Sequence, residues 1–255
     1  MDLHYVSDGP EDGPVVVLSG SLGSDVRMWQ PQVTPLVDAG YRVVRHDHRG
    51  HGGSPVPPEP YELDDLGRDA TRLLDTLGVA RVHWVGLSLG GMLGMWLATH
   101  RPERIASLTA CCTSAKLGPP EMWADRARTV RERGTGAIAE AVVRRWFTPA
   151  WFEANPERAR HYEQMVAATP AEGYAGCCGA IERMDLLDAL AGIAAPTLVI
   201  AGAEDPATPL EHGERIAAGV QNGRFEVVDG AAHLGNAERP EAFTSLLLAH
   251  LKGVS

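Results

Sequence analysis

The chain has 255 residues, 44% of them hydrophobic and 22% charged, and its formal net charge is −10. This length fits one large domain or a domain with an insertion, and the acidic balance argues against nucleic acid or an anionic membrane as a partner. No apolar run approaches the roughly 20 residues that span a bilayer, and the N-terminal residues do not resemble a signal peptide. We therefore expect a cytoplasmic protein whose main partner is neither a nucleic acid nor a membrane.

Short apolar segments alternate with segments of helical periodicity. The expected strands cover residues 15–18, 41–44, 82–85, 105–109, 197–201 and 225–228. The expected helices cover residues 30–39, 62–78, 89–100, 210–219 and 240–252. This alternation predicts an α/β fold, with a mostly parallel sheet covered by helices on both faces.

The alternation stops once, between residues 113 and 192, where helical patterning continues without a convincing strand. This segment holds three of the six tryptophans, with ten basic and eleven acidic residues, so its formal charge is only −1. We expect an α-helical cap over residues 113–192, inserted into a core domain formed by residues 1–112 and 193–255.

The segment Gly86-Leu87-Ser88-Leu89-Gly90 matches the Gly-x-Ser-x-Gly nucleophile elbow, and it lies directly between an expected strand and an expected helix. In such an elbow the serine hydroxyl is lifted out of a tight turn that leaves room only for glycine on either side. The helix that follows directs its N-terminal dipole and free N–H groups toward a developing oxyanion. A chance serine in an ordinary turn would also fit the five letters, but their position favours Ser88 as a nucleophile.

A serine hydroxyl needs a positioned base, and the base needs a carboxylate that orients it. His233 follows the last expected strand and precedes the final helix, which makes it the candidate base. Asp205 follows the penultimate strand, and the G-x-x-D spacing favours it over the adjacent Glu204. The chain order of Ser88, Asp205 and His233 is that of the α/β-hydrolase fold, which is the fold class we predict.

Backbone N–H groups are expected to hold the oxyanion. One is that of Leu89, which follows the nucleophile. The other is expected in Ser19-Gly20-Ser21-Leu22-Gly23, which stands where this fold usually has H-G-x-x-G and makes the Ser21 N–H the candidate. The departure from that pattern at Ser19 leaves the position of the second donor open by one residue.

The other histidines and the cysteines show no spacing typical of a metal site, so neither a metal nor a cofactor is expected. Residues 46–54 resemble the structural D-x-R-G-x-G-x-S turn of this fold, although His48 or His51 in it remains an alternative pocket residue. The cysteines form two adjacent pairs, at 111–112 and 177–178, and we expect them to be buried as small apolar residues.

Beyond the elbow, the sequence resembles the 3-oxoadipate enol-lactonases, also called β-ketoadipate enol-lactone hydrolases, over nearly the whole chain. The segments that carry the resemblance are 21–25 with Met28-Trp29, 86–92, 115–118, 145–148, 173–178 and 232–240. The segments in the cap are the most specific, because caps differ between families of this fold. One departure is Cys111-Cys112-Thr113-Ser114, where the family more often has Asn-Thr-Ala-Ala.

The resemblance implies hydrolysis of an anionic lactone through an acyl-enzyme, in the β-ketoadipate pathway of aromatic catabolism. A protein of charge −10 repels such a substrate at long range, so a local cation is expected to meet its carboxylate. The candidates are cap residues, each of which also fits a solvated surface charge: Lys116, Arg126, Arg144 and Arg145. Trp123 and Trp146 are candidates for the pocket wall or for the core of the cap.

Two alternatives remain open. The same three residues would serve a carboxylesterase or a carbon–carbon bond hydrolase of ring-cleavage products. A non-catalytic small-molecule-binding protein on this fold is disfavoured, because all three expected catalytic residues are present. Epoxide hydrolases and haloalkane dehalogenases are disfavoured, because they have aspartate where this chain has Ser88.

Overall fold

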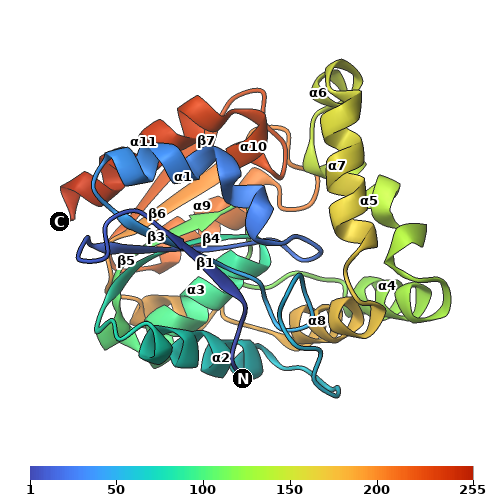
Figure 1. Cartoon of the computed structure of the whole chain (residues 1–255), viewed down its shortest axis with the longest axis horizontal. Coiled ribbons are helices and arrows are strands. Elements are labelled where there is room, and N and C mark those ends of the chain that lie inside the picture. Colours follow the sequence, from blue (N-terminus) through green and yellow to red (C-terminus); the bar gives the residue numbers. More distant parts are fainter. Residues whose placement is uncertain (255) are drawn as a thin grey trace.

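The computed structural model describes residues 1–254 and contains a seven-stranded sheet (Figure 1). The strand order is β1-β3-β2-β4-β5-β6-β7, and all neighbours are parallel except β1 and β3. The strands are β1 (Tyr5–Asp8), β2 (Val15–Ser19), β3 (Arg42–His46), β4 (Val82–Leu87), β5 (Ile105–Cys111), β6 (Thr197–Gly202) and β7 (Gly223–Val228). The predicted fold class is confirmed.

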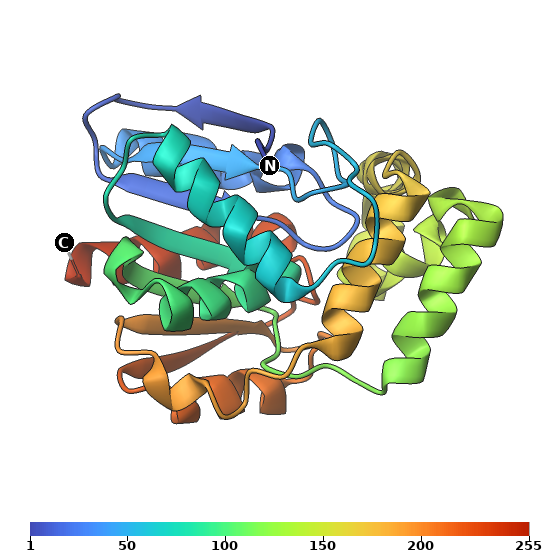
Figure 2. The same cartoon turned by 90° about the horizontal axis from the view of Figure 1, so that it is seen from below.

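Helices cover both faces of this sheet. The helices of the sheet domain are α1 (Gln30–Asp38), α2 (Leu63–Thr76), α3 (Leu89–His100), α9 (Leu210–Gly219), α10 (Gly235–Glu238) and α11 (Pro240–Gly253). Helices α1 and α11 pack together on one face, and α2 and α3 pack on the other (Figures 1 and 2). Helix α3 is nearly all buried because it lies between α2 and strands β4 and β5, which agrees with its apolar sequence.

The sequence patterns missed one strand, β1. It pairs antiparallel with β3 at the edge of the sheet, and its four residues are alternately exposed and half-buried. An edge strand with so little buried surface has no apolar run to reveal it. The other six strands were predicted correctly to within a few residues at their ends, since β2, β4 and β6 are completely buried.

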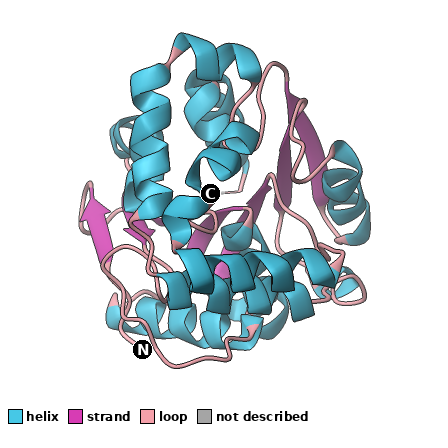
Figure 3. Ribbon diagram, turned by 90° about the vertical axis from the view of Figure 1, so that its right-hand side faces the viewer, coloured by secondary structure: helices cyan, strands magenta, loops and turns pink. Residues whose placement is uncertain are grey.

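The segment between residues 113 and 192 contains five α-helices and no strand in the described structure. They are α4 (Pro120–Arg133), α5 (Ala139–Trp146), α6 (Pro149–Ala154), α7 (Pro156–Ala167) and α8 (Ala171–Arg183). These helices stand together beside one end of the sheet domain (Figures 2 and 3). We refer to them as the cap; its exact boundaries as a domain stay a prediction.

Parallel pairing places the carboxyl ends of β2, β4, β5, β6 and β7 along one edge of the sheet. Ser19 at the end of β2 pairs with Gly86, and Cys111 at the end of β5 pairs with both Leu87 and Ile200. The loops that follow these strands therefore meet at the same edge, where ligand sites in open α/β sheets form. None of the helices within residues 1–254 combines the length and apolarity needed to cross a membrane.

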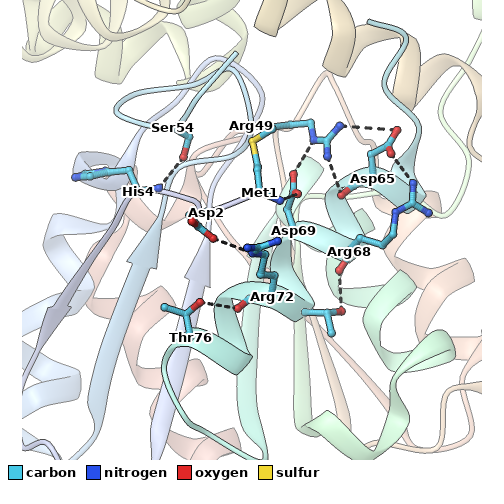
Figure 4. A network of polar contacts seen from close by, with 12 residues as sticks. Met1, Asp2, His4, Arg49, Ser54, Asp65, Arg68, Asp69, Arg72 and Thr76 are labelled. Atoms are coloured by element: carbon cyan, nitrogen blue, oxygen red, sulfur yellow. Dashed lines mark hydrogen bonds and ion pairs between the residues drawn. The ribbon is translucent and has the colours of Figure 1, made fainter. Parts of the chain in front are cut away.

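The turn after β3 is tied to α2 by ionic contacts (Figure 4). The Arg49 Nε atom lies 2.7 Å from Asp69 Oδ2, and Arg49 also faces Asp65 at 3.8 Å. The amino group of Met1 reaches the other oxygen of Asp69, also at 2.7 Å. Because Asp69 is almost fully buried, these contacts compensate its desolvation and fix the turn on the sheet domain.

Candidate active site

Ser88 lies at the sharp turn between β4 and α3 and has a left-handed backbone, with φ of 55°. A non-glycine residue in this region is strained, and such strain is found at functional turns. The neighbouring glycines are sterically required: a Cβ at Gly86 would lie 2.0 Å from the Gly90 carbonyl oxygen, and one at Gly90 would lie 2.1 Å from that of Ser19. The structure therefore has the geometry of a nucleophile elbow at Ser88.

The elbow is held from the neighbouring strand. The Ser88 N–H donates to the Cys111 carbonyl at 2.9 Å, and the Thr113 hydroxyl donates to the Ser88 carbonyl at 2.7 Å. Both polar groups of the Ser88 backbone are thereby engaged, and neither bond uses its side chain. This bracing by the end of β5 compensates the strain of the turn.

His233 and Asp205 form a buried pair. The His233 Nδ1 atom lies 2.8 Å from Asp205 Oδ2, which also accepts the Thr208 hydroxyl at 2.6 Å, while Oδ1 accepts the Ala207 N–H at 2.8 Å. Burial alone would raise the pKa of Asp205, but the charge and hydrogen bond of His233, with the bonds from Thr208 and Ala207, lower it below its usual value. An ionised Asp205 only accepts, so His233 carries a proton on Nδ1 and leaves Nε2 free as a base.

Glu204 does not share this position. It is exposed on the outer side of the same loop, whereas Asp205 is 5% exposed. The structure therefore directs only Asp205 of the adjacent acidic pair at His233.

A cavity of about 330 Å³ opens between the sheet edge and the cap, and both Ser88 and His233 line it. Its size suits a small organic molecule. The wall on the sheet side includes Ser21, Leu22, Pro206, Ala207, Pro209 and His212, and the wall on the cap side includes Leu117, Met122, Trp123, Arg126, Val142, Arg145, Trp146, Tyr174 and Ile181.

Of the predicted oxyanion donors, Ser21 lines this cavity, and Leu89 directly follows Ser88, which also lines it. Leu89 is the first residue of α3, where backbone N–H groups have no partner within the helix. The Ser21 N–H points at Met28 Sδ at 3.3 Å, and a thioether is a weak acceptor. The Leu22 N–H has no hydrogen-bond partner within residues 1–254. Both Ser21 and Leu22 thus remain candidates for the second donor.

His48 and His51 do not line the cavity but support the loop that carries Ser21. His48 Nε2 lies 2.9 Å from the Gly20 carbonyl and donates to it. His51 Nε2 accepts the Gly23 N–H at 3.0 Å while its Nδ1 donates to the Arg49 carbonyl at 3.1 Å. Both bonds of His51 require a neutral ring, and burial lowers its pKa to about 3. These histidines are structural in the described chain.

Two of the four predicted cations face the cavity. Arg126 and Arg145 are half-buried, and neither has a carboxylate partner within the described residues. The Arg126 guanidinium stacks over the Trp123 ring at 4.7 Å from its centroid, and its positive charge partly offsets the rise that burial causes in the pKa of Tyr174. Burial, and next the charge of Arg126, lower the pKa of Arg145. The pair therefore concentrates uncompensated positive charge in the cavity wall.

The other two predicted cations point elsewhere. Arg144 is exposed, pairs with Glu140 at 2.9 Å and packs on Phe152, and Lys116 is exposed and pairs with Asp185 at 2.7 Å. Neither lines the cavity. Exposed ion pairs of this kind contribute little to stability, about 0–1 kcal/mol, so both residues fit solvated surface charges.

Trp123 and Trp146 line the cavity and are also buried in the cap, so both predicted roles apply. The sequence patterns did not identify Tyr174 and His212 as cavity residues. Tyr174 falls in one of the cap segments that resemble the lactonases. His212 has no signal in the sequence, because its place in the cavity wall depends on a contact with a residue far away in the chain: its Nδ1 lies 2.7 Å from Ser114 Oγ.

All four cysteines are buried and free. Within residues 1–254 no three or more histidine, cysteine, aspartate or glutamate side chains form a group that could hold a metal ion.

Comparison with known proteins agrees with this geometry. A family model described as alpha/beta hydrolase fold matches residues 13–240. The 3-oxoadipate enol-lactonase 2 of Acinetobacter baylyi is 40% identical over 250 residues, covering 98% of this chain and 93% of that protein. The crystal structure of the enol-lactonase from Burkholderia xenovorans LB400 is 40% identical, with a TM-score of 0.95 over 98% of this chain and 96% of that chain.

A second group of relatives has a different name. The putative carbamate hydrolase RutD of Variovorax paradoxus is 33% identical over 260 residues, covering 100% of this chain and 98% of that protein. It is a more distant relative than the lactonases but shares the whole length of the fold. On the sequence identity, the coverage and the structural similarity together, the chain is an ester hydrolase that belongs to the 3-oxoadipate enol-lactonase family of the α/β-hydrolases.

Proposed function

We propose that this enzyme hydrolyses the lactone ester of 3-oxoadipate enol-lactone to 3-oxoadipate, as a step of aromatic catabolism through β-ketoadipate. The observation that carries this proposal concerns two cap arginines, Arg126 and Arg145. Neither has a carboxylate partner within the described residues, and both line the cavity that Ser88 and His233 also line. An ester-hydrolysing group and a receptor for an anion thus share one small cavity, which is what a lactone with a free carboxylate requires.

In the proposed acylation, Ser88 Oγ attacks the lactone carbonyl while His233 Nε2 takes its proton. The carbonyl oxygen becomes an oxyanion, which the N–H groups of Leu89 and of Ser21, or its neighbour Leu22, stabilise. The ring C–O bond then breaks, and the electron pair leaves on the enol oxygen, which takes the proton from His233. An enolate is a far better leaving group than an alkoxide, and the enol tautomerises to the ketone, which draws the reaction forward.

In the proposed deacylation, water attacks the acyl carbonyl and His233 again takes the proton. The second oxyanion collapses, the bond to Ser88 Oγ breaks, and the serine regains its proton from His233. Asp205 holds the imidazole in the required tautomer and stabilises its charged form during both halves. Every proton transfer is served by residues of this chain, and the proposed reaction uses no cofactor.

We further propose that Arg126 and Arg145 bind the carboxylate of the substrate. A carboxylate under a largely apolar cap is poorly held unless a cation meets it. A charge-assisted contact of this kind commonly contributes about 1.5–3 kcal/mol, or roughly a 10- to 150-fold change in kcat/KM. The stacking on Trp123 holds the Arg126 guanidinium in place before a ligand binds.

Neutral replacement of either arginine tests this assignment. In R126Q and in R145Q, kcat/KM for the acidic enol-lactone is expected to fall roughly 10- to 150-fold, because one charge-assisted contact is lost. An uncharged aryl ester of similar size should be hydrolysed almost as well as by the wild type. The measurement is steady-state kinetics with both substrates.

The matched controls are R144Q and K116Q, which remove the same charge from the same cap outside the cavity. Both controls should leave kcat/KM for both substrates close to wild type. Parallel changes for the two substrates in all four variants would contradict the assignment, and the carboxylate would then have to be bound by the sheet domain.

A further inference from the structure

The carboxylate of Glu238 bridges the cap and the loop that carries His233. Its Oε1 accepts the hydroxyl and the backbone N–H of Thr148, at 2.5 and 3.1 Å, and its Oε2 accepts the Ala232 N–H at 2.8 Å. Thr148 lies in the cap between α5 and α6, and Ala232 directly precedes His233. Glu238, Thr148 and Ala232 are all buried.

A second contact joins the same two segments on the other side of the histidine. The Leu234 N–H donates to the Trp146 carbonyl at 2.8 Å. Residues 232 and 234 are therefore both tied to the short cap segment 146–148, and His233 stands between them. In Figure 1, α10, which ends at Glu238, lies on the side of the sheet domain that faces α6 and α7.

The Glu238 carboxylate is surrounded by neutral hydrogen-bond donors. Glu238 has no ion-pair partner within the described residues; its oxygens meet only neutral donors. A buried carboxylate is costly unless its hydrogen bonds are satisfied, and a donor left without its acceptor costs about 1–3 kcal/mol. The three donors from two segments therefore fix the relative position of cap and loop more tightly than apolar packing alone does.

We propose that Glu238 is a positioning residue that acts through the loop of His233 and couples the cap to the base. The proposal rests on the assignment of His233 as the base. Arg145 and Trp146 line the cavity; Trp146 is the first residue of the bridged segment 146–148, and Arg145 directly precedes it. Contacts of the substrate with these two residues therefore act directly on the residues beside His233. The bridge holds Nε2 of His233 in line with Ser88.

Glu238 and Thr148 offer variants that separate positioning from folding. In E238Q the amide NH2 group faces one of the N–H donors, and in T148V the hydroxyl donor is lost. Displacement of a catalytic group by about 1 Å can cost up to 10²-fold, so we expect each variant to lower kcat roughly 10- to 100-fold. KM should change little, because neither residue lines the cavity.

T148S is the matched control. It keeps the hydroxyl that donates to Glu238 and also accepts the Trp151 N–H at the start of α6, so its kcat should stay close to wild type. Because T148V also removes the latter contact, the double variant T148V/E238Q is needed. If both residues act through one bridge, the double variant should be little worse than the more impaired single variant.

The rate at which a fluorophosphonate labels Ser88 gives an independent measure of base assistance. In E238Q and T148V this rate should fall in proportion to kcat, while the fully labelled fraction and the melting temperature report folded protein. Labelling at the wild-type rate, additive losses in the double variant, or a loss of kcat in T148S equal to that in T148V would each overturn the proposal.

The kinetic measurements use the neutral aryl ester, and the labelling and melting measurements use no substrate, so none of them depends on the identity of the natural substrate. A fall of aryl-ester kcat in E238Q without any wild-type turnover of the enol-lactone would support the positioning role and contradict the proposed substrate.

Discussion

Replacing Ser88, the proposed nucleophile, with alanine is expected to lower kcat by roughly 10⁴- to 10⁶-fold, as removal of the nucleophile does in serine hydrolases. Without the hydroxyl no acyl-enzyme can form, and only water held near the oxyanion site remains as an attacking group. The backbone contacts of Ser88 with Cys111 and Thr113 do not use its side chain, so S88A should fold normally.

The measurement is kcat with an aryl ester and with the enol-lactone, together with a thermal unfolding curve. Alanine keeps a Cβ, so the left-handed turn at this position carries the same strain as in the wild type. If the folded variant kept more than a tenth of the wild-type activity, Ser88 would not be the nucleophile.

Replacing Asp205 with asparagine is expected to lower kcat by about 10⁴-fold. The asparagine amide would donate to His233 Nδ1 and so force the proton onto Nε2, which is then no longer a base. The imidazolium formed in the transition state would also lose the opposite charge that now lies 2.8 Å away.

E204Q is the control for D205N, since it neutralises the adjacent carboxylate, which is exposed and makes no contact with His233. Its kcat should stay close to that of the wild type, as measured in the same assay. A large loss in E204Q with a small loss in D205N would show that the acid has been assigned to the wrong residue.

Most of the sheet was predictable because its strands are buried on both faces and read as apolar runs. Val15 to Leu18, in β2, are 8% exposed or less, and the pattern there is unambiguous. β1 was missed because an exposed edge strand has no such signature. The individual helices of the cap could not be predicted either. Helical periodicity predicts that helices are present, but not how they pack against one another.

The candidate site also has a part that the sequence predicts and a part that depends on tertiary packing. Ser88, His233 and Asp205 each follow a strand at the same edge of a parallel sheet, so their order and spacing in the chain were enough to bring them together. The sequence pattern does not show which of Arg126 and Arg144 faces the cavity. Which of them reaches the cavity depends on the packing of α4 and α5 against α8 and α7, respectively.

The loop at residues 19–23, which carries the candidate second oxyanion donor, could be predicted only in part. Its position after β2 was predictable, but the direction of each N–H group was not. The Ser21 N–H is directed at Met28 Sδ because the Gly20 carbonyl is held by His48 and by the Gly90 N–H. Only the tertiary contacts of these residues reveal that the neighbouring Leu22 N–H has no hydrogen-bond partner within residues 1–254.

The most direct test of the proposed function is the hydrolysis of enzymatically generated β-ketoadipate enol-lactone by the wild-type protein, followed spectrophotometrically beside a neutral aryl ester and a simple carbamate. If Arg126 and Arg145 bind the substrate carboxylate as proposed, kcat/KM for the enol-lactone should exceed that for the aryl ester by at least about tenfold. Turnover of the aryl ester or the carbamate without turnover of the enol-lactone would contradict the proposal.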